Sequence, residues 1–167
     1  MVGRALTLKS SGIARVLHTD AHILIPNSKN GAQVRAIWDT GATGSAITKK
    51  VSKALGLIPT GFAQVNTAGG IVTQNTFTVD IGLPNGVIIQ GITVTEVDGL
   101  SSGSEALIGM DIISLGDFSI TNHNGKTCMS FRVPSGHEID YVANPNYGLT
   151  PIKNIPKIKN KFTNKRR

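Results

Sequence analysis

The feature that most constrains the fold is an apolar run, Val34–Trp38, that ends at a carboxylate, Asp39. A small hydroxyl residue, glycines and an alanine follow at once, up to Gly44. The apolar residues predict a buried strand, and the glycines allow backbone angles and close approaches that a Cβ would forbid. The carboxylate is therefore expected on a tight loop beside the core, which is a typical setting for catalysis.

Short strand-like segments separated by turn signals fill most of the chain. Residues 15–25 alternate between apolar and polar, and Asn30-Gly31 predicts a hairpin turn into the run that ends at Trp38. Helical spacing and a candidate N-cap, Thr48, predict one short helix. The further expected segments are strands at 62–66, 71–83, 87–89, 92–97, 106–108, 118–121 and 127–133, and a helix at 111–115. This pattern predicts an all-β fold, a closed and mostly antiparallel β-barrel with one or two short helices.

Three landmarks resemble the retropepsin-like aspartic peptidases in kind, order and spacing. The first is Asp39-Thr40-Gly41-Ala42, a signature that these peptidases have once per chain. The second, residues 106–113, is similar to their late signature of an apolar pair, a glycine and a short helix. Between the two, residues 66–71 stand where the family has a glycine-rich flap hairpin. The resemblance covers residues 14–134 and implies the family's acid-protease β-barrel.

The resemblance implies an aspartic endopeptidase, a hydrolase in which two carboxylates share a proton and activate a water molecule. Because the chain has one signature, the resemblance implies a homodimer in which Asp39 of each chain meets its counterpart at a two-fold axis. The implied partner is an extended peptide or protein substrate, and no cofactor or metal is implied. The remaining implied site residues are Thr40, Gly41 and Ala42 in the loop, Ala68, Gly69 and Gly70 in the flap, and Ile108 and Gly109 as support beneath the loop.

The chain departs from the viral members of that family at two places. Those members commonly have an acidic residue shortly after the signature and an arginine after the late glycine, where this chain has Thr43-Gly44-Ser45 and Met110-Asp111. Cellular and bacterial members vary there, so the chain resembles them more closely. A second hypothesis is a catalytically silent peptide-binding or assembly module on the same fold. The glycine-rich turn is correspondingly either a flap or an ordinary hairpin turn.

Charge divides the chain into parts. Seven Lys and Arg residues and no acid follow residue 151. Their charge of +7 equals the net charge of the whole chain, so the residues before them are neutral overall. We expect residues 1–13 to be an N-terminal arm or edge strand, 14–134 the protease domain, and 135–167 an extension with a flexible basic tail. Nucleic-acid binding by this tail is not favoured, because Phe162 is its only aromatic residue. A solvated tail or a processing site is the preferred interpretation.

The remaining signals concern compartment and metals. The lone cysteine, Cys128, cannot form an internal disulfide, and a buried structural thiol in a reducing compartment is expected. No apolar segment reaches the ~18 residues of a transmembrane helix, and no signal peptide is evident, so a cytoplasmic protein is expected. His18 and His22 share a strand face but have no third ligand, which favours surface histidines over a metal site.

Overall fold

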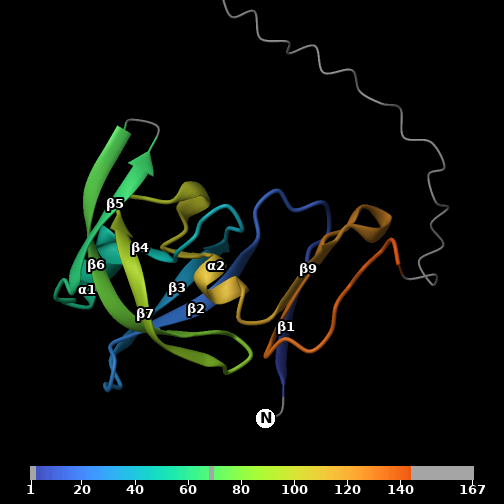
Figure 1. Cartoon of the computed structure of the whole chain (residues 1–167), viewed down its shortest axis with the longest axis horizontal. Coiled ribbons are helices and arrows are strands. Elements are labelled where there is room, and N and C mark those ends of the chain that lie inside the picture. Colours follow the sequence, from blue (N-terminus) through green and yellow to red (C-terminus); the bar gives the residue numbers. More distant parts are fainter. Residues whose placement is uncertain (1–2, 68–69, 144–167) are drawn as a thin grey trace, which may run out of the picture. The chain divides into compact units, whose positions relative to one another are not determined.

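Strands are the main regular element of the structure, a computed structural model that describes residues 3–67 and 70–143 (Figure 1). Residues up to His137 form one unit, and the chain after it forms a second. The elements of the first unit are β1 (Arg4–Lys9), β2 (His18–Leu24), β3 (Gly31–Trp38), β4 (Ala46–Thr48), α1 (Lys49–Ala54), β5 (Gly61–Thr67), β6 (Gly70–Gly82), β7 (Ile88–Val97), β8 (Ala106–Ile108), α2 (Met110–Ile113), β9 (Asp117–Thr121) and β10 (Cys128–Val133). The predicted all-β class with short helices is confirmed.

The larger sheet has seven strands in the order β2-β3-β8-β4-β7-β6-β5. Since β2 also pairs with β6, the strands from β2 to β6 in this order form a closed ring of pairings. Most of these pairs are antiparallel, but β3 pairs with β8 and β4 with β7 in the parallel sense. The parallel pair of β3 and β8 matters for the site, because it brings two distant segments of the sequence together.

The smaller sheet has three strands in the order β1-β10-β9. β1 is one edge strand of this sheet and pairs antiparallel with β10, from Arg4 opposite Val133 to Lys9 opposite Cys128. β9 and β10, which correspond to the strands expected at 118–121 and 127–133, pair antiparallel and form a hairpin around Asn124-Gly125. The first and last strands of the compact unit therefore lie side by side.

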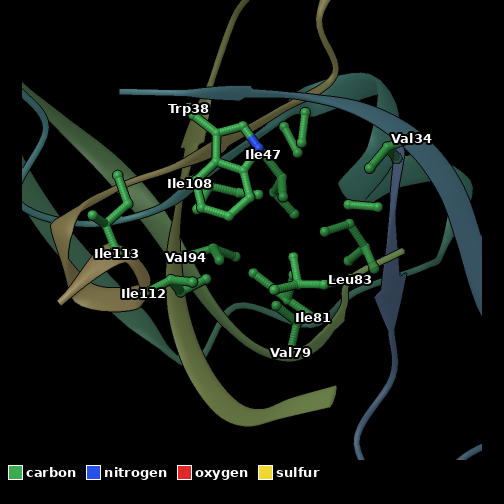
Figure 2. Packing of buried hydrophobic residues seen from close by; sticks show 14 of the residues in the cluster. Val34, Trp38, Ile47, Val79, Ile81, Leu83, Val94, Ile108, Ile112 and Ile113 are labelled. Atoms are coloured by element: carbon green, nitrogen blue, oxygen red, sulfur yellow. The ribbon is translucent and has the colours of Figure 1, made fainter. Parts of the chain in front are cut away.

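The hydrophobic core includes residues of both sheets. Figure 2 shows the part of it that comes from the larger sheet and α2. Its centre is aliphatic, as in Ile23, Val79 and Val94, which are fully buried. Trp38 connects the sheets, because its ring stacks on Phe118 at a centroid distance of 5.6 Å and lies 5.0 Å from Phe131. The bulky residue before Asp39 therefore fills the junction between the two sheets.

The helices and turns agree with the sequence in position and differ in detail. Thr48 is the N-cap residue of α1, but its side chain makes no capping hydrogen bond. Gly56 ends this helical segment with a φ of 60°, a value that favours glycine. The expected strands at 87–89 and 92–97 are one strand, β7, in which Gly91 has a positive φ of 68° beside a register shift against β6.

Candidate active site

Asp39 lies at the point where the two signature segments meet. It directly follows β3, whose last residue, Trp38, pairs with Ile108 of β8. The backbone N–H of Asp39 donates to the carbonyl oxygen of Ile108 at 3.0 Å. The parallel pairing of β3 with β8 thus fixes the position of the Asp39 backbone at the end of the strand.

The loop after Asp39 is a tight turn held by that residue. The Gly41 N–H donates to Asp39 Oδ1 at 2.8 Å, and the Ala42 N–H donates to the Asp39 carbonyl oxygen at 3.3 Å. Asp39 is half-buried, whereas Thr40 and Gly41 are exposed within this chain. The carboxylate is thus oriented by its own loop while the tip of the loop faces outward.

The start of α2 supports the loop from beneath. The Met110 N–H donates to the Ala42 carbonyl oxygen at 2.9 Å, and the Asp111 N–H donates to that of Thr43 at 3.1 Å. Gly109, the residue before Met110, lies against the Gly44 backbone. A Cβ at residue 109 would be 2.5 Å from the Gly44 carbonyl oxygen. Only a glycine fits between the two segments without displacing one of them.

Asp111 ties the far end of the loop to α2. Its Oδ2 accepts the Ser45 N–H at 2.9 Å, and its Oδ1 accepts both the Ser45 hydroxyl at 2.8 Å and the Ile112 N–H at 3.0 Å. The Ser45 oxygen in turn accepts the Gly109 N–H at 3.1 Å, and Ser45 is 1% exposed. The sequence shows Ser45 and Asp111 as departures from the viral pattern but does not predict their contact, because no local pattern links residues 66 positions apart.

A pocket of about 630 Å³ opens beside the loop. Its walls come from the signature loop, from β5 and from β7. The lining residues are Gly41, Ala42, Thr43, Gly44, Ser45, Ala46, Ala63, Gln64, Val65, Thr95, Val97, Leu100 and Leu107. The lining mixes small apolar side chains with hydroxyl groups and one amide, so it suits a peptide segment with both polar backbone and side chains.

The hairpin of β5 and β6 borders this pocket. Its strands pair antiparallel from Gly61 opposite Thr76 to Thr67 opposite Gly70, which confirms the two predicted arms. Gly70 has a φ of 113° and is exposed. The predicted flap residues Ala68 and Gly69 lie outside the described residues, so the flap remains a prediction.

A match to a sequence model identifies the protein family of this chain. A sequence model of the family described as "gag-polyprotein putative aspartyl protease" matches residues 25–114, which is more than half of the chain. The chain belongs to the retropepsin-like aspartic proteases. The matched range of this retropepsin-like chain includes Asp39, every residue that lines the pocket, and α2.

Solved structures agree with this family at the level of fold. A retropepsin-like aspartic protease from Rickettsia conorii matches with a TM-score of 0.51 and 17% identity, over 80% of the retropepsin-like chain and 97% of its own. The EIAV protease, solved with the inhibitor HBY-793, matches with a TM-score of 0.50 and 20% identity, over 63% and 91% of the two chains. No curated protein sequence matches. At these identities the likeness concerns the fold alone.

Three smaller expectations about the retropepsin-like chain can be compared with the structure. Cys128 is partly exposed, not fully buried as expected. The His18 ring contacts Arg35 through Nδ1 at 3.3 Å, and burial, followed by the Arg35 charge, lowers the pKa of His18. Within residues 3–67 and 70–143, no group of three or more His, Cys, Asp or Glu could hold a metal, and no helix is long and apolar enough to span a membrane.

Proposed function

We propose that the chain is an aspartic endopeptidase whose active unit is a homodimer, with Asp39 from each chain as the catalytic pair. The observation that carries this proposal is the setting of Asp39, a half-buried carboxylate on a loop braced by β8 and α2. The exposed loop tip at Thr40 and Gly41 supports a second chain docking there. In that dimer the Thr40 hydroxyl would hydrogen-bond the partner's loop and hold the pair together.

In the proposed reaction the two carboxylates share one proton, since like charges so close cannot both be ionised. The ionised member accepts a proton from a water molecule, whose oxygen attacks the carbonyl carbon of the scissile peptide bond. The protonated member donates a hydrogen bond to the carbonyl oxygen as negative charge develops on it. A proton then passes to the amide nitrogen, the C–N bond breaks, and a carboxylic acid and an amine are released.

The substrate would bind as an extended strand across the pocket. Main-chain hydrogen bonds that the Gly41 carbonyl oxygen accepts would give affinity, and alternate side chains would enter the pocket between Ala42 and the hairpin. We assign the flap role to Ala68, Gly69 and Gly70, and the support of the loop to Ile108 and Gly109. We expect cleavage between apolar residues, at mildly acidic to neutral pH. In this proposal residues 14–134 are the protease domain and residues 135–167 are an extension.

A peptide-binding or assembly module is the second candidate function. One observation favours it, because the residues that line the pocket of about 630 Å³ do not include Asp39. Binding of an extended peptide therefore does not require the carboxylate pair. This candidate predicts tight peptide binding without cleavage.

The test is cleavage of a mixed peptide library by the purified full chain across pH. We expect Asp39→Asn to lose roughly 10³-fold or more in kcat/KM. Asp98→Asn is the matched control, since the Asp98 side chain is 78% exposed and Asp98 is not among the residues that line the pocket. Cleavage that survives Asp39→Asn would refute the assignment of the catalytic residue.

Mixing wild-type and Asp39→Asn chains separates a shared site from independent ones. If each site needs both carboxylates and the chains assort randomly, activity per wild-type chain falls in proportion to the wild-type fraction. Activity per wild-type chain that stays constant in the mixtures would contradict the shared pair. Sedimentation of the same samples gives the fraction of dimer.

A further inference from the structure

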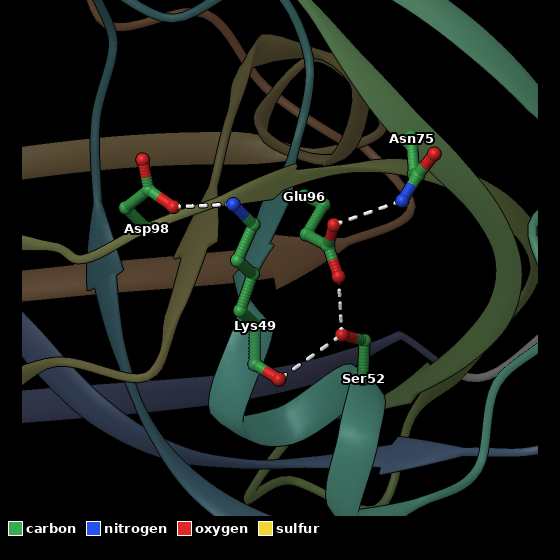
Figure 3. Close-up of polar contacts among 5 residues, drawn as sticks. All are labelled: Lys49, Ser52, Asn75, Glu96 and Asp98. Atoms are coloured by element: carbon green, nitrogen blue, oxygen red, sulfur yellow. Dashed lines mark hydrogen bonds and ion pairs between the residues drawn. The ribbon is translucent and has the colours of Figure 1, made fainter.

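A buried glutamate of β7 contacts side chains of two other elements, α1 and β6 (Figure 3). Glu96 is 6% exposed and accepts a hydrogen bond from the Ser52 hydroxyl of α1 at 2.5 Å. Its other carboxylate oxygen accepts the Asn75 side-chain amide of β6 at 3.0 Å. We call Ser52, Asn75 and Glu96 the Glu96 cluster.

No salt bridge found in the described part of the chain explains the burial of this carboxylate, although its charge, after the contact with Asp98, helps to raise the pKa of Lys49. The salt bridges found within residues 3–67 and 70–143 do not include Glu96, and the nearby Lys49 instead contacts Asp98 at 2.6 Å. The Ser52 hydroxyl also contacts the Lys49 carbonyl oxygen at 3.2 Å, although it has one proton to donate. Burying a carboxylate with neutral partners is unfavourable compared with an apolar residue, so a role beyond stability is indicated.

The position of the cluster in the fold indicates that role. Along β7, Val94 and Glu96 face the interior, whereas the alternate residues Thr95 and Val97 line the pocket. Along β6, Phe77 is buried, whereas the residues from Gly70 to Thr73, nearer the hairpin turn, are exposed. Asn75 lies between the buried and the exposed parts of the strand. The cluster therefore lies behind the pocket wall and at the root of the hairpin.

We propose that Glu96 is a positioning residue that fixes the root of the β5–β6 hairpin against α1. The part of β6 nearer the hairpin turn, Gly70 to Thr73, is exposed, so the direction of the hairpin depends on contacts at its root. Through Asn75 and Ser52, Glu96 sets how far the hairpin stands from the signature loop across the pocket. Its effect on catalysis rests on the proposed endopeptidase function, whereas its effect on the hairpin does not.

Two substitutions at residue 96 separate positioning from charge. In Glu96→Gln the amide can donate to the Ser52 oxygen, the Ser52 proton can pass to the Lys49 carbonyl, and the amide oxygen still accepts from Asn75. Glu96→Leu fills a similar volume and removes both contacts. We expect Glu96→Leu to raise KM about tenfold while kcat changes less, and Glu96→Gln and the control Asp98→Asn to stay within about twofold of wild type.

A distance measurement tests the hairpin without relying on activity. Spin labels are placed at Ile71→Cys, on the exposed part of β6, and at Lys29→Cys, in the exposed β2–β3 turn, with Cys128→Ser in the background. Excess unlabelled chain restricts the signal to distances within one chain. We expect the distance distribution to broaden or shift in Glu96→Leu and to match wild type in Glu96→Gln.

The outcomes distinguish this proposal from the proposed function. An unchanged distance distribution in a folded Glu96→Leu chain, as judged by thermal unfolding, would overturn the positioning role whatever the activity. A changed distribution in Glu96→Leu, restored in Glu96→Gln, supports the role even if wild type cleaves no peptide. If wild type cleaves and KM is the same in Glu96→Leu, the endopeptidase stands and the effect of the hairpin position on substrate binding is refuted.

Discussion

Replacing Asp111 by asparagine isolates the contact that braces the signature loop. The two carboxylate oxygens accept three N–H or O–H groups, two from Ser45 and one from the Ile112 backbone. An asparagine has one acceptor oxygen and one NH₂ group. If the NH₂ replaces Oδ2 it faces the Ser45 N–H, and if it replaces Oδ1 it faces the Ile112 N–H. Either orientation of the amide therefore sets a donor against a backbone donor.

The expected cost follows from one buried donor that loses its acceptor. Such a loss destabilises a fold by about 2 kcal/mol, and hydrogen bonds to an ionised acceptor lie at the upper end of the range. For a unit of this size that corresponds to a fall in melting temperature of roughly 6 °C. Thermal unfolding of Asp111→Asn and wild type at the same chain concentration measures it.

The matched control is again Asp98→Asn, an exposed carboxylate paired with Lys49. Surface pairs of this kind contribute about 0 to 1 kcal/mol, so its melting temperature is expected to change little. Equal melting temperatures for Asp111→Asn and wild type would refute the reasoning, because the donors at Ser45 and Ile112 would then not depend on an ionised acceptor.

The remaining predictions concern a close contact and a pH dependence. Gly109→Ala places a Cβ 2.5 Å from the Gly44 carbonyl oxygen and should lower unfolding stability by about 3 kcal/mol, whereas Gly99→Ala, with open space around it, should be nearly neutral in the same urea titration. The Ser135 hydroxyl, the Gly136 N–H and the Arg132 charge lower the pKa of Asp117 from 3.8 to about 2. Since the ionised form is favoured in the fold, its stabilisation is complete above about pH 4 and is lost as pH falls through about 2. The difference in melting temperature between wild type and Asp117→Asn should therefore narrow over that window, and a constant difference would contradict it.

The sequence predicts the parts of the site that depend on neighbouring residues. The apolar run before Asp39 predicted β3, and the glycines after it predicted the tight loop whose hydrogen bond from Gly41 N–H to Asp39 Oδ1 is present. Alternation and turn residues likewise predicted the arms of the β5–β6 hairpin. These features could be predicted because strand burial and turn conformation are determined within a few residues.

Two features that join distant segments were not predicted. The pairing of β1 with β10 and the brace between Ser45 and Asp111 connect residues that no local pattern relates. Glu96 is a different case, because a signal was present. It follows Ile92 and Val94 at even spacing in a predicted strand, so the alternation placed a carboxylate on the core face. A charged residue in phase with a core face is a pattern that sequence analysis can search for.

Trp38, which packs between the two sheets, can also serve as a fluorescence reporter of the site. It is the chain's single tryptophan, and it directly precedes Asp39. Its ring stacks on Phe118, and its Nε1–H donates to the Thr19 hydroxyl at 2.9 Å. The intrinsic tryptophan emission therefore comes from one place, the backbone that carries the carboxylate. Peptide titrations, chain association and unfolding of the loop can each be followed at that place in the unlabelled protein.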